Sequence, residues 1–508
     1  MAGLRLTSST ETELFMITSV PSPSLSRPSF RRWFLIATLL TAFQGLMASP
    51  RGKPLPKPGS PGPHSRALET ALDRYVASPD PTYSWKTAAI TDVPGGKAAV
   101  IDMTSQTWLT TNEVNRTVWR HWLVIVRPTE VETTTALLFI GGGSNRDSKP
   151  PTPTREMVQI ATATRSVVAE LKMVPNQPLV FGEDGRERVE DDLIAYTWDK
   201  YLRTGDERWP ARLPMTKAAV RAMDTVTAWT GTQEGGGRAM ERFVVSGGSK
   251  RGWTTWTTAI VDKRVAAICP IVIDVLNMSP SMVHHFQAYG FFSPAVGNYT
   301  EQGIMNWLGT PEMAALQRIE DPYFYRSRLT LPKLLMNGCG DQFFLPDSSR
   351  FYFDQLPGTK YLRYVPNADH SLKGTDAYET LGAWQWATMR GTSLPRFTWS
   401  LRDDGTVAVD AETKPKAVKL WQANNPTARD FRMEVIGPAW WPTRLEAAGN
   451  SYFGRPQPSR GWTAYMIELT YDIGAPVPFK VTTPVWVAPD TLPHAPPVPR
   501  PPTGFLRR

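Results

Sequence analysis

Short apolar runs alternate with longer helical stretches between about residues 65 and 395. The runs show almost no polar alternation, which is typical of strands that are buried on both faces of a sheet. They cover residues 121–126, 136–140, 178–181, 243–245, 265–273, 334–337 and 361–365. Amphipathic helices are predicted between them at 155–172, 191–202 and 215–230. This order predicts an α/β domain with a mostly parallel sheet covered by helices on both faces.

The pattern changes twice along the chain. Residues 275–330 are rich in Met, Phe, Tyr and Trp and are too long for a simple connection, so they predict a helical insertion above the sheet. From residue 396 to about 490, alternating strands are broken by Gly, Pro and Asp, which indicates a small antiparallel β-sandwich. We therefore expect an α/β domain over 65–395 and a sandwich domain over 396–490.

The N-terminal 64 residues have the composition of an export signal and a linker. Arg31 and Arg32 precede an apolar run, 33–47, that has the length of a signal-peptide core and is short of a membrane span. Cleavage after Ala48 is disfavoured by Leu46, so residues 1–49 are interpreted as a signal peptide or an uncleaved signal anchor. A proline-rich linker is expected over 50–64, and a similar proline-rich basic tail over 491–508. The protein is therefore expected to be exported: periplasmic, secreted or anchored by its signal.

The formal net charge of +9 belongs to the ends of the chain. Residues 1–66 carry a net +6, residues 491–508 a net +3, and the body between them sums to zero. A neutral body argues against a basic nucleic-acid groove, so no nucleic-acid partner is expected. The basic termini allow at most weak association with an anionic envelope or membrane surface, and nothing in the sequence indicates the oligomeric state.

Residues 242–267 (RFVVSGGSKRGWTTWTTAIVDKRVAA) contain the most informative motif. A β-branched strand runs into glycines and Ser249, and a helix follows. A serine on such a turn lies at the carboxyl edge of the sheet, above the positive end of the helix dipole, as a nucleophile requires. The usual elbow motif is G-x-S-x-G. Here Gly247 stands two residues before Ser249, but Arg251 occupies the position two residues after it, and the next glycine is Gly252. The motif alone is therefore also compatible with an ordinary Gly-Ser turn.

A serine nucleophile needs a histidine base, and elimination leaves one candidate. The six histidines are His64, His121, His284, His285, His370 and His494. In α/β-hydrolases the order is serine, acid, histidine, which excludes the first two. His494 lies in the tail, and His284 and His285 lie in the insertion with no strand and acid before them. His370, in the loop after the run 361–365, is the predicted base.

The acid that orients the histidine is expected after the preceding strand, where Asp341 follows the run 334–337. Asp347 and Asp369 are alternatives. Asp347 is better placed to cap the helix expected after it, and Asp369 is adjacent to His370 and would have difficulty facing its ring.

The run 136–140 leads into Gly141-Gly142-Gly143-Ser144-Asn145, which resembles the oxyanion loop of esterases. We expect the backbone N–H groups of Gly142, Gly143 and Lys250 to hold the oxyanion. Two roles fit the charges of Lys250 and Arg251. They either bind an anionic group of the substrate or form ion pairs with buried acids. Trp253 and Trp256, three residues apart on the helix after Ser249, are expected to serve packing rather than substrate contact.

No cofactor or metal site is expected. The glycine runs lack the endings of phosphate-binding and dinucleotide-binding loops. His284 and His285 are adjacent and would point apart on a helix. The only cysteines, Cys269 and Cys339, exclude a disulfide scaffold, and two free buried thiols are favoured over a pair.

At this level the sequence resembles the PhoPQ-activated pathogenicity-related protein family. The resemblance covers about residues 65–485 and rests on long collinear motifs, among them LLFIGGGSN, VVSGGSKRGWTTW, LPKLLMNGCGDQFFLPDS and YVPNADHSL. It implies an exported α/β-hydrolase fold with a C-terminal β-sandwich. It also implies a nucleophile, acid and histidine at Ser249, Asp341 and His370, with an SKRG elbow as a family feature.

Two functions fit these observations. The first is a serine hydrolase, esterase or peptidase, that cleaves an ester or peptide bond of a small-molecule or peptide substrate through an acyl-enzyme. The second is a non-catalytic secreted signalling or binding protein on the same scaffold, because a fold does not determine a function. The resemblance names no substrate.

Overall fold

The computed structural model describes residues 69–506 except 183 and 458, and these belong to one compact unit, residues 63–508. The predicted signal (1–49) and linker (50–64) lie outside the described residues. Within the described range, no helix has both the length and the apolar character needed to cross a membrane.

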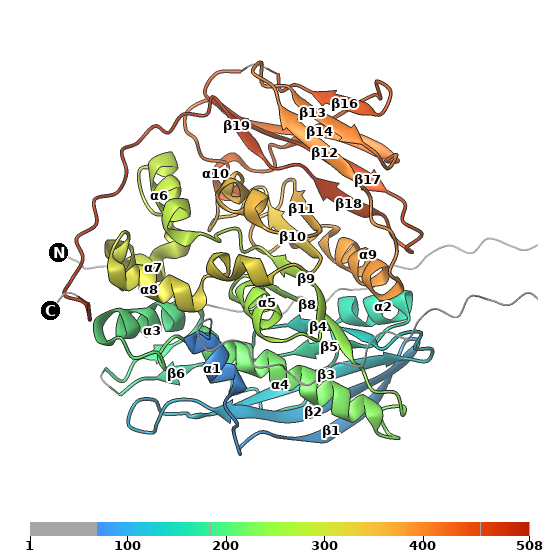
Figure 1. Ribbon diagram of the computed structural model, residues 1–508, viewed down its shortest axis with the longest axis vertical. Coiled ribbons are helices and arrows are strands. Elements are labelled where there is room, and N and C mark those ends of the chain that lie inside the picture. Colours follow the sequence, from blue (N-terminus) through green and yellow to red (C-terminus); the bar gives the residue numbers. More distant parts are fainter. Residues whose placement is uncertain (1–68, 183, 458, 507–508) are drawn as a thin grey trace, which may run out of the picture. The chain divides into compact units, whose positions relative to one another are not determined.

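The centre of the unit is one long twisted sheet with six parallel strands in its middle (Figure 1). In spatial order these are β5 (Val168–Leu171), β4 (Thr135–Ile140), β8 (Arg242–Gly248), β9 (Val265–Ile271), β10 (Lys333–Gly338) and β11 (Lys360–Val365). The antiparallel strands β3 (Val118–Pro128), β2 (Gly96–Thr107) and β1 (Ser84–Val93) extend the sheet beyond β5. This is an α/β-hydrolase fold, as predicted.

Helices cover both faces of the sheet, and the strand side chains alternate between them. Ala136, Leu138 and Ile140 of β4 belong to the buried cluster that includes α4 (Arg212–Gly231) and α5 (Lys250–Val261). Leu137 belongs to the opposite cluster, which includes α2 (Arg155–Thr164) and α9 (Ala377–Arg390). Further helices on the first side are α1 (Ala71–Ala77) and α3 (Glu190–Thr204).

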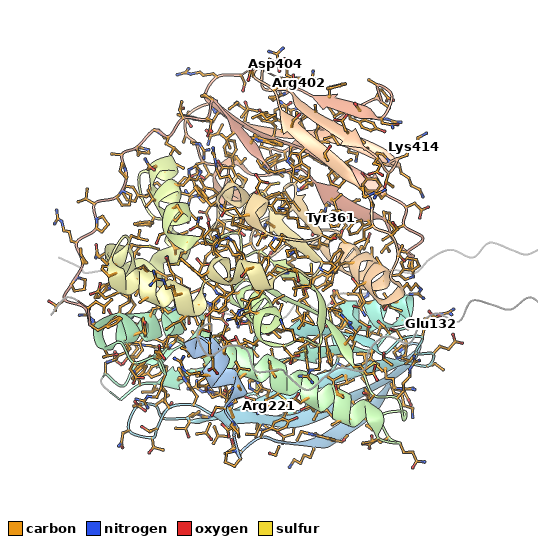
Figure 2. All side chains as sticks on the ribbon, viewed as in Figure 1. Glu132, Arg221, Tyr361, Arg402, Asp404 and Lys414 are labelled. Atoms are coloured by element: carbon orange, nitrogen blue, oxygen red, sulfur yellow. The ribbon has the colours of Figure 1, made fainter. Side chains whose placement is uncertain are left out.

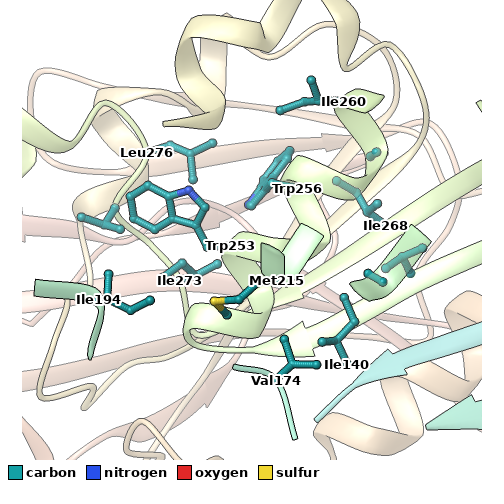
Figure 3. Packing of buried hydrophobic residues seen from close by; sticks show 14 of the residues in the cluster. Ile140, Val174, Ile194, Met215, Trp253, Trp256, Ile260, Ile268, Ile273 and Leu276 are labelled. Atoms are coloured by element: carbon teal, nitrogen blue, oxygen red, sulfur yellow. The ribbon is translucent and has the colours of Figure 1, made fainter. Parts of the chain in front are cut away.

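Charged side chains lie mainly around this core. In Figure 2 the labelled residues Glu132, Arg402, Asp404 and Lys414 lie at the periphery, whereas the ring of Tyr361 lies inside, between the sheet and its covering elements. Around α5, Trp253 and Trp256 pack among aliphatic side chains from the strands and neighbouring segments (Figure 3). The helix after Ser249 is therefore anchored in the core, which holds the turn before it in place.

Two predictions of local structure are wrong. The helix expected over 155–172 ends at Thr164, and residues 168–171 are the central strand β5, which is buried along its whole length. The run 178–181 forms only the short strand β6 (Leu179–Val180), which pairs with β7 (Glu187–Arg188) outside the main sheet. A four-residue segment such as VAEL is too short to show the period of a helix or of a strand. Tertiary pairing therefore decides whether it forms a helix or a strand.

The helical insertion is confirmed. Between β9 and β10 the chain forms α6 (Met278–Tyr289), η2 (Pro294–Val296), α7 (Gly297–Glu301), η3 (Ile304–Trp307), α8 (Pro311–Glu320) and η4 (Pro322–Arg328). Two further short turns, η5 (Ser348–Phe351) and η6 (Phe353–Gln355), follow β10.

The C-terminal strands form two antiparallel layers. One layer is β12 (Phe397–Leu401), β13 (Val407–Ala411) and β16 (Ser451–Gly454). The other is β18 (Phe479–Thr482), β17 (Trp462–Tyr471), β14 (Ala417–Asn425) and β15 (Trp441–Arg444), with β19 (Trp486–Ala488) beside β17. This second layer continues the central sheet, since Leu362 of β11 pairs with Thr482 of β18. The sandwich and the α/β core therefore share one sheet.

The C-terminal tail extends over the surface of the protein, with most of its described residues exposed. It runs along the insertion (Figure 1): the His494 N–H donates to the Gln287 carbonyl over 3.1 Å, and the Phe505 N–H to the Leu202 carbonyl over 3.3 Å. The proline content prevents helix and central strand, but it does not prevent an extended segment from packing on a neighbouring surface.

Phe505→Ala is expected to lower the free energy of unfolding by about 1–2 kcal/mol, because full burial of such a side chain is worth roughly 1.5–3 kcal/mol and Phe505 is only half-buried. Its ring contacts Tyr201 at a centroid distance of 5.4 Å and lies over Gly205. Denaturant unfolding measures the change. Val498→Ala in the same tail is the control, because Val498 is 83% exposed and should leave stability unchanged. Equal effects of the two substitutions would contradict the packed tail.

Candidate active site

Ser249 forms a strained turn between β8 and α5. Its φ of 58° and ψ of −127° are rare for a residue with a side chain. The turn is held by two backbone hydrogen bonds: the Ser249 N–H donates to the Ile271 carbonyl over 2.8 Å, and the Trp253 N–H to the Ser249 carbonyl over 3.0 Å. This is the geometry expected of a nucleophile elbow.

The glycines around the elbow are required by close backbone contacts. A Cβ at Gly247 would lie 2.9 Å from the Ile140 carbonyl oxygen, and one at Gly252 would lie 2.8 Å from that of Ile271. Gly252 thus lets the helix pack against the neighbouring strand, although it stands three residues after Ser249. Arg251 occupies the position where a glycine is usual, and its side chain leaves the turn toward Glu190.

Asp341 and His370 are brought together by the parallel pair β10 and β11, whose carboxyl ends lie side by side. The Asp341 Oδ2 lies 2.8 Å from the His370 Nδ1. The other oxygen of Asp341 accepts the backbone N–H groups of Phe343 and Phe344 over 2.7 and 3.3 Å, and the residue is only 3% exposed. The carboxylate is thereby fixed in position beside the imidazole.

The second ring nitrogen of His370, Nε2, is buried and has no hydrogen-bond partner among the described residues. The His370 ring contacts that of Phe343 at a centroid distance of 4.2 Å, and Phe343 lines the same cavity as Ser249. A contact between serine and base often tightens only when substrate is bound, so this arrangement suits a resting enzyme.

The two alternative acids have other partners. Asp369 accepts the N–H and the hydroxyl of Ser371 over 2.9 and 2.6 Å. The expectation that Asp347 caps the following helix is wrong, because its side chain makes no cap hydrogen bond and instead contacts His284 and Arg429. Burial opposes ionisation of Asp347, but the Arg429 guanidinium, 2.6 Å away, holds the pKa of that carboxyl well below its usual range.

The glycine loop after β4 lies next to the elbow, since Ile140 pairs with Gly247. In this loop the Gly142 carbonyl accepts the Met173 N–H over 2.8 Å. No hydrogen bond within the described chain uses the N–H of Gly142 or Gly143. A Cβ at Gly142 would lie 2.7 Å from the Arg251 Nη2, so glycine permits this close approach.

Lys250 and Arg251 pair with acids at the start of α3, which decides between the two alternatives for them. The Lys250 Nζ lies 2.7 Å from Glu190 and 3.3 Å from Asp191, and the Arg251 guanidinium donates to Glu190 over 2.6 and 2.8 Å. Partial burial opposes ionisation of Glu190, but these cations hold the pKa of its carboxyl well below its usual range. Sequence analysis missed Glu190 and Asp191; the acidic run at the start of the predicted helix was the available signal.

A mainly apolar cavity opens at Ser249. Its lining includes Trp253, which is also packed in the core as expected, whereas Trp256 is fully buried away from the cavity. Much of the remaining wall comes from the insertion: Met278, Met282, Ile304, Met305, Leu308 and Met313. Lys250, Asp191 and Arg212 supply polar groups beside this wall. The site can therefore hold an apolar or aromatic group next to a polar reaction centre.

The two adjacent histidines contact different partners, and the two cysteines are unpaired. His284 contacts Asp347, and His285 accepts the Ser293 N–H over 2.9 Å, so the two histidines point apart as expected. No group of three or more His, Cys, Asp or Glu side chains in residues 69–506 is arranged to hold a metal ion. Cys269 and Cys339 are free and buried as favoured, and burial raises the pKa of Cys269 to about 12.

Comparisons with known proteins identify relatives along most of the chain. The PhoPQ-activated pathogenicity-related protein family matches residues 72–432. Autocrine proliferation repressor protein A of Dictyostelium discoideum is 38% identical over 457 residues, which cover 84% of this chain and 92% of that protein.

Among solved structures, acetyl xylan esterase 1 from Thermoanaerobacterium sp. has 13% identity and a TM-score of 0.43, covering 64% of this chain and 93% of its own. Glucuronoyl esterase from Solibacter usitatus has 12% identity and a TM-score of 0.37, with coverages of 64% and 92%.

Proposed function

The chain belongs to the PhoPQ-activated pathogenicity-related protein family, and from that premise we propose that it is an exported serine hydrolase with Ser249, Asp341 and His370 as its catalytic triad. One observation carries the proposal. A histidine held by a buried carboxylate, with its other nitrogen unpartnered, contacts Phe343, which lines the same cavity as a strained serine. This is the arrangement that acyl transfer requires.

The reaction proceeds in two halves. Ser249 Oγ bonds to the carbonyl carbon of an ester or amide while its proton passes to His370 Nε2. The alkoxide accepts hydrogen bonds from the backbone N–H groups of Gly142 or Gly143 and of Lys250. Its collapse expels the alcohol or amine, which takes the proton from His370. Water then attacks the acyl-serine as its proton passes to His370; the second alkoxide collapses, the bond to Ser249 Oγ breaks, and Oγ takes the proton from His370 as the acid leaves.

Asp341 acts through His370. Its Oδ2 accepts the Nδ1–H over 2.8 Å, which selects the tautomer with a basic Nε2 and stabilises the imidazolium formed during attack. The role requires no metal and no cofactor.

Fluorophosphonate labelling tests this function. Folded wild-type protein should react covalently at Ser249, detected as a mass shift on the peptide that contains it. A second candidate function follows from the name of the Dictyostelium relative, an autocrine proliferation repressor, which suggests a secreted signalling protein. Absence of labelling in folded protein would favour that alternative.

The cavity wall indicates an apolar or aromatic group on the substrate. Met305→Trp should fill part of this space, because Met305 is half-buried on the wall. We expect the kcat/KM ratio of p-nitrophenyl octanoate to p-nitrophenyl acetate to fall about 10-fold, since pocket contacts worth roughly 1–3 kcal/mol are lost for the longer chain only. The acetate is the internal control, and an unchanged ratio would exclude this cavity as the acyl pocket.

Export is proposed from Arg31, Arg32 and the apolar run 33–47. N-terminal sequencing of the protein recovered outside the cytoplasm of its own host distinguishes a cleaved signal from a retained anchor.

A further inference from the structure

The segment between β14 and β15 reaches from the sandwich to the carboxyl edge of the parallel strands. We call residues 426–440 the connector; it includes the short helix α10 (Met433–Ile436). Although it belongs to the sandwich by sequence, several of its polar contacts are with the loops that carry Asp341 and His370.

The first contact is with the acid loop. The Met433 N–H donates to the Gly340 carbonyl over 2.8 Å. A Cβ on Gly340 would lie 2.9 Å from that of Met433 and 3.1 Å from the Ala368 carbonyl oxygen. The connector, the acid loop and the histidine loop therefore meet at Gly340, the residue before Asp341.

The second contact is with the histidine loop. Asn367 lies three residues before His370 and has a φ of 52°. Its side-chain amide makes two hydrogen bonds to the backbone of Trp440: Nδ2 donates to the carbonyl over 2.9 Å, and Oδ1 accepts the N–H over 2.8 Å. Trp440 is 3% exposed, so the pair is anchored in the interior.

A third path runs through the insertion. The Arg432 Nη1 donates to the Ser293 hydroxyl over 3.4 Å, and that hydroxyl donates to the Gln342 carbonyl over 2.7 Å. The Gln342 side chain in turn accepts the His370 N–H over 3.0 Å. The backbone around His370 is therefore linked to the connector by two routes, one through Asn367 and one through Gln342.

We propose that the connector is a positioning element of the active site and that Asn367 is the positioning residue for His370. The proposal rests on the proposed function of Ser249, Asp341 and His370. Loops that carry catalytic groups need rigid support from the scaffold, since a displacement of about 1 Å costs roughly 100-fold in rate. The sandwich supplies that support, which accounts for its sharing one sheet with the α/β core.

Asn367→Gly removes the two side-chain hydrogen bonds without disturbing the backbone, because glycine adopts the positive φ at no steric cost. We expect kcat for p-nitrophenyl butyrate to fall about 10- to 100-fold with KM within about two-fold. The low-field proton resonance of the His370 Nδ1–H···Asp341 hydrogen bond should also weaken or disappear. Asn424→Gly is the matched control: Asn424 Nδ2 donates to the Arg460 and Trp462 carbonyls in the same sandwich, away from these loops.

Met433→Pro tests the acid-loop contact independently. Proline removes the N–H that Gly340 accepts, and the first position of a helix tolerates it. Arg432 before it has φ −58° and ψ 140°, a conformation suited to a residue that precedes proline. Arg155→Pro, at the first position of α2 and exposed, is the control and should keep both the activity and the resonance.

The outcomes separate this inference from the proposed function. A resonance and kcat unchanged in Asn367→Gly would overturn the positioning role, as would an equal loss in Asn424→Gly. Absence of the resonance in wild-type protein would also overturn it, because there would be no hydrogen bond to position. If wild-type protein neither hydrolyses the ester nor reacts with fluorophosphonate, while the resonance responds as expected, the catalytic function fails and the positioning of the Asp341–His370 pair stands.

Discussion

Ser249→Ala is expected to abolish both fluorophosphonate labelling and hydrolysis of p-nitrophenyl butyrate. Alanine lacks the oxygen that forms the acyl-enzyme, and no other described serine combines a positive φ with a place in the lining of this cavity. Loss of a triad serine lowers kcat by about 10⁶-fold in a well-studied serine protease, which is below detection for a weak surrogate substrate. Intact-mass analysis and a colorimetric assay measure the two effects.

Ser246→Ala is the matched control for this substitution. Ser246 lies on β8, the strand that leads to Ser249, but its hydroxyl donates to the Cys269 carbonyl over 2.7 Å and is fully buried. We expect this variant to be labelled like wild-type protein once it is folded. Persistent labelling of Ser249→Ala would instead place the reactive nucleophile elsewhere.

Asp341→Asn is expected to lower kcat by about 10⁴-fold with little change in structure, because an amide can replace the carboxylate in shape but holds the imidazole in the wrong tautomer. The backbone N–H groups of Phe343 and Phe344 can still be accepted by the amide oxygen, which should keep the loop in place. Steady-state kinetics measures the loss, and circular dichroism verifies the fold.

Asp369→Asn provides the comparison for the acid. Asp369 is adjacent to His370 in sequence, but its carboxylate contacts Ser371. Its substitution should change kcat by no more than about two-fold. A loss equal to that of Asp341→Asn would contradict the assignment of Asp341, rather than Asp369, as the acid that orients His370. Asp347→Asn is unsuited as a control, since it would leave buried Arg429 without its charged partner and destabilise the protein.

Local sequence was sufficient for the parts of the site that depend on chain order. Strands buried on both faces have continuous apolar runs, and the glycines around Ser249 indicate a tight turn. The candidate position of the elbow therefore followed from residues within about ten positions of Ser249. The histidine followed from elimination, because only His370 came after a strand and an acid. The pairing of His370 with Asp341 was predicted, and the 2.8 Å contact agrees with it; their catalytic roles are still to be tested.

Other features depended on partners far away in the chain. Residues 168–171 became a strand because β3 and β4 flank them, which no four-residue pattern reports. Whether Lys250 and Arg251 bind substrate or pair internally depended on Glu190, some sixty positions earlier. The composition of the tail predicts only an extended proline-rich segment, whereas the backbone hydrogen bonds that attach it to α6 and α3 depend on surfaces far away in the chain.

By itself, then, the sequence determined most of the parallel strands and the helices between them, the neutral charge of the body, and the elbow, acid and histidine as candidates. These follow from local periodicity, composition and chain order. The tertiary structure alone decided that the cations beside Ser249 are paired with acids, that Trp253 borders the cavity, and that the connector supports the loops of Asp341 and His370. These contacts join residues many tens of positions apart, and their energies depend on distance and burial in space, which a linear pattern does not encode.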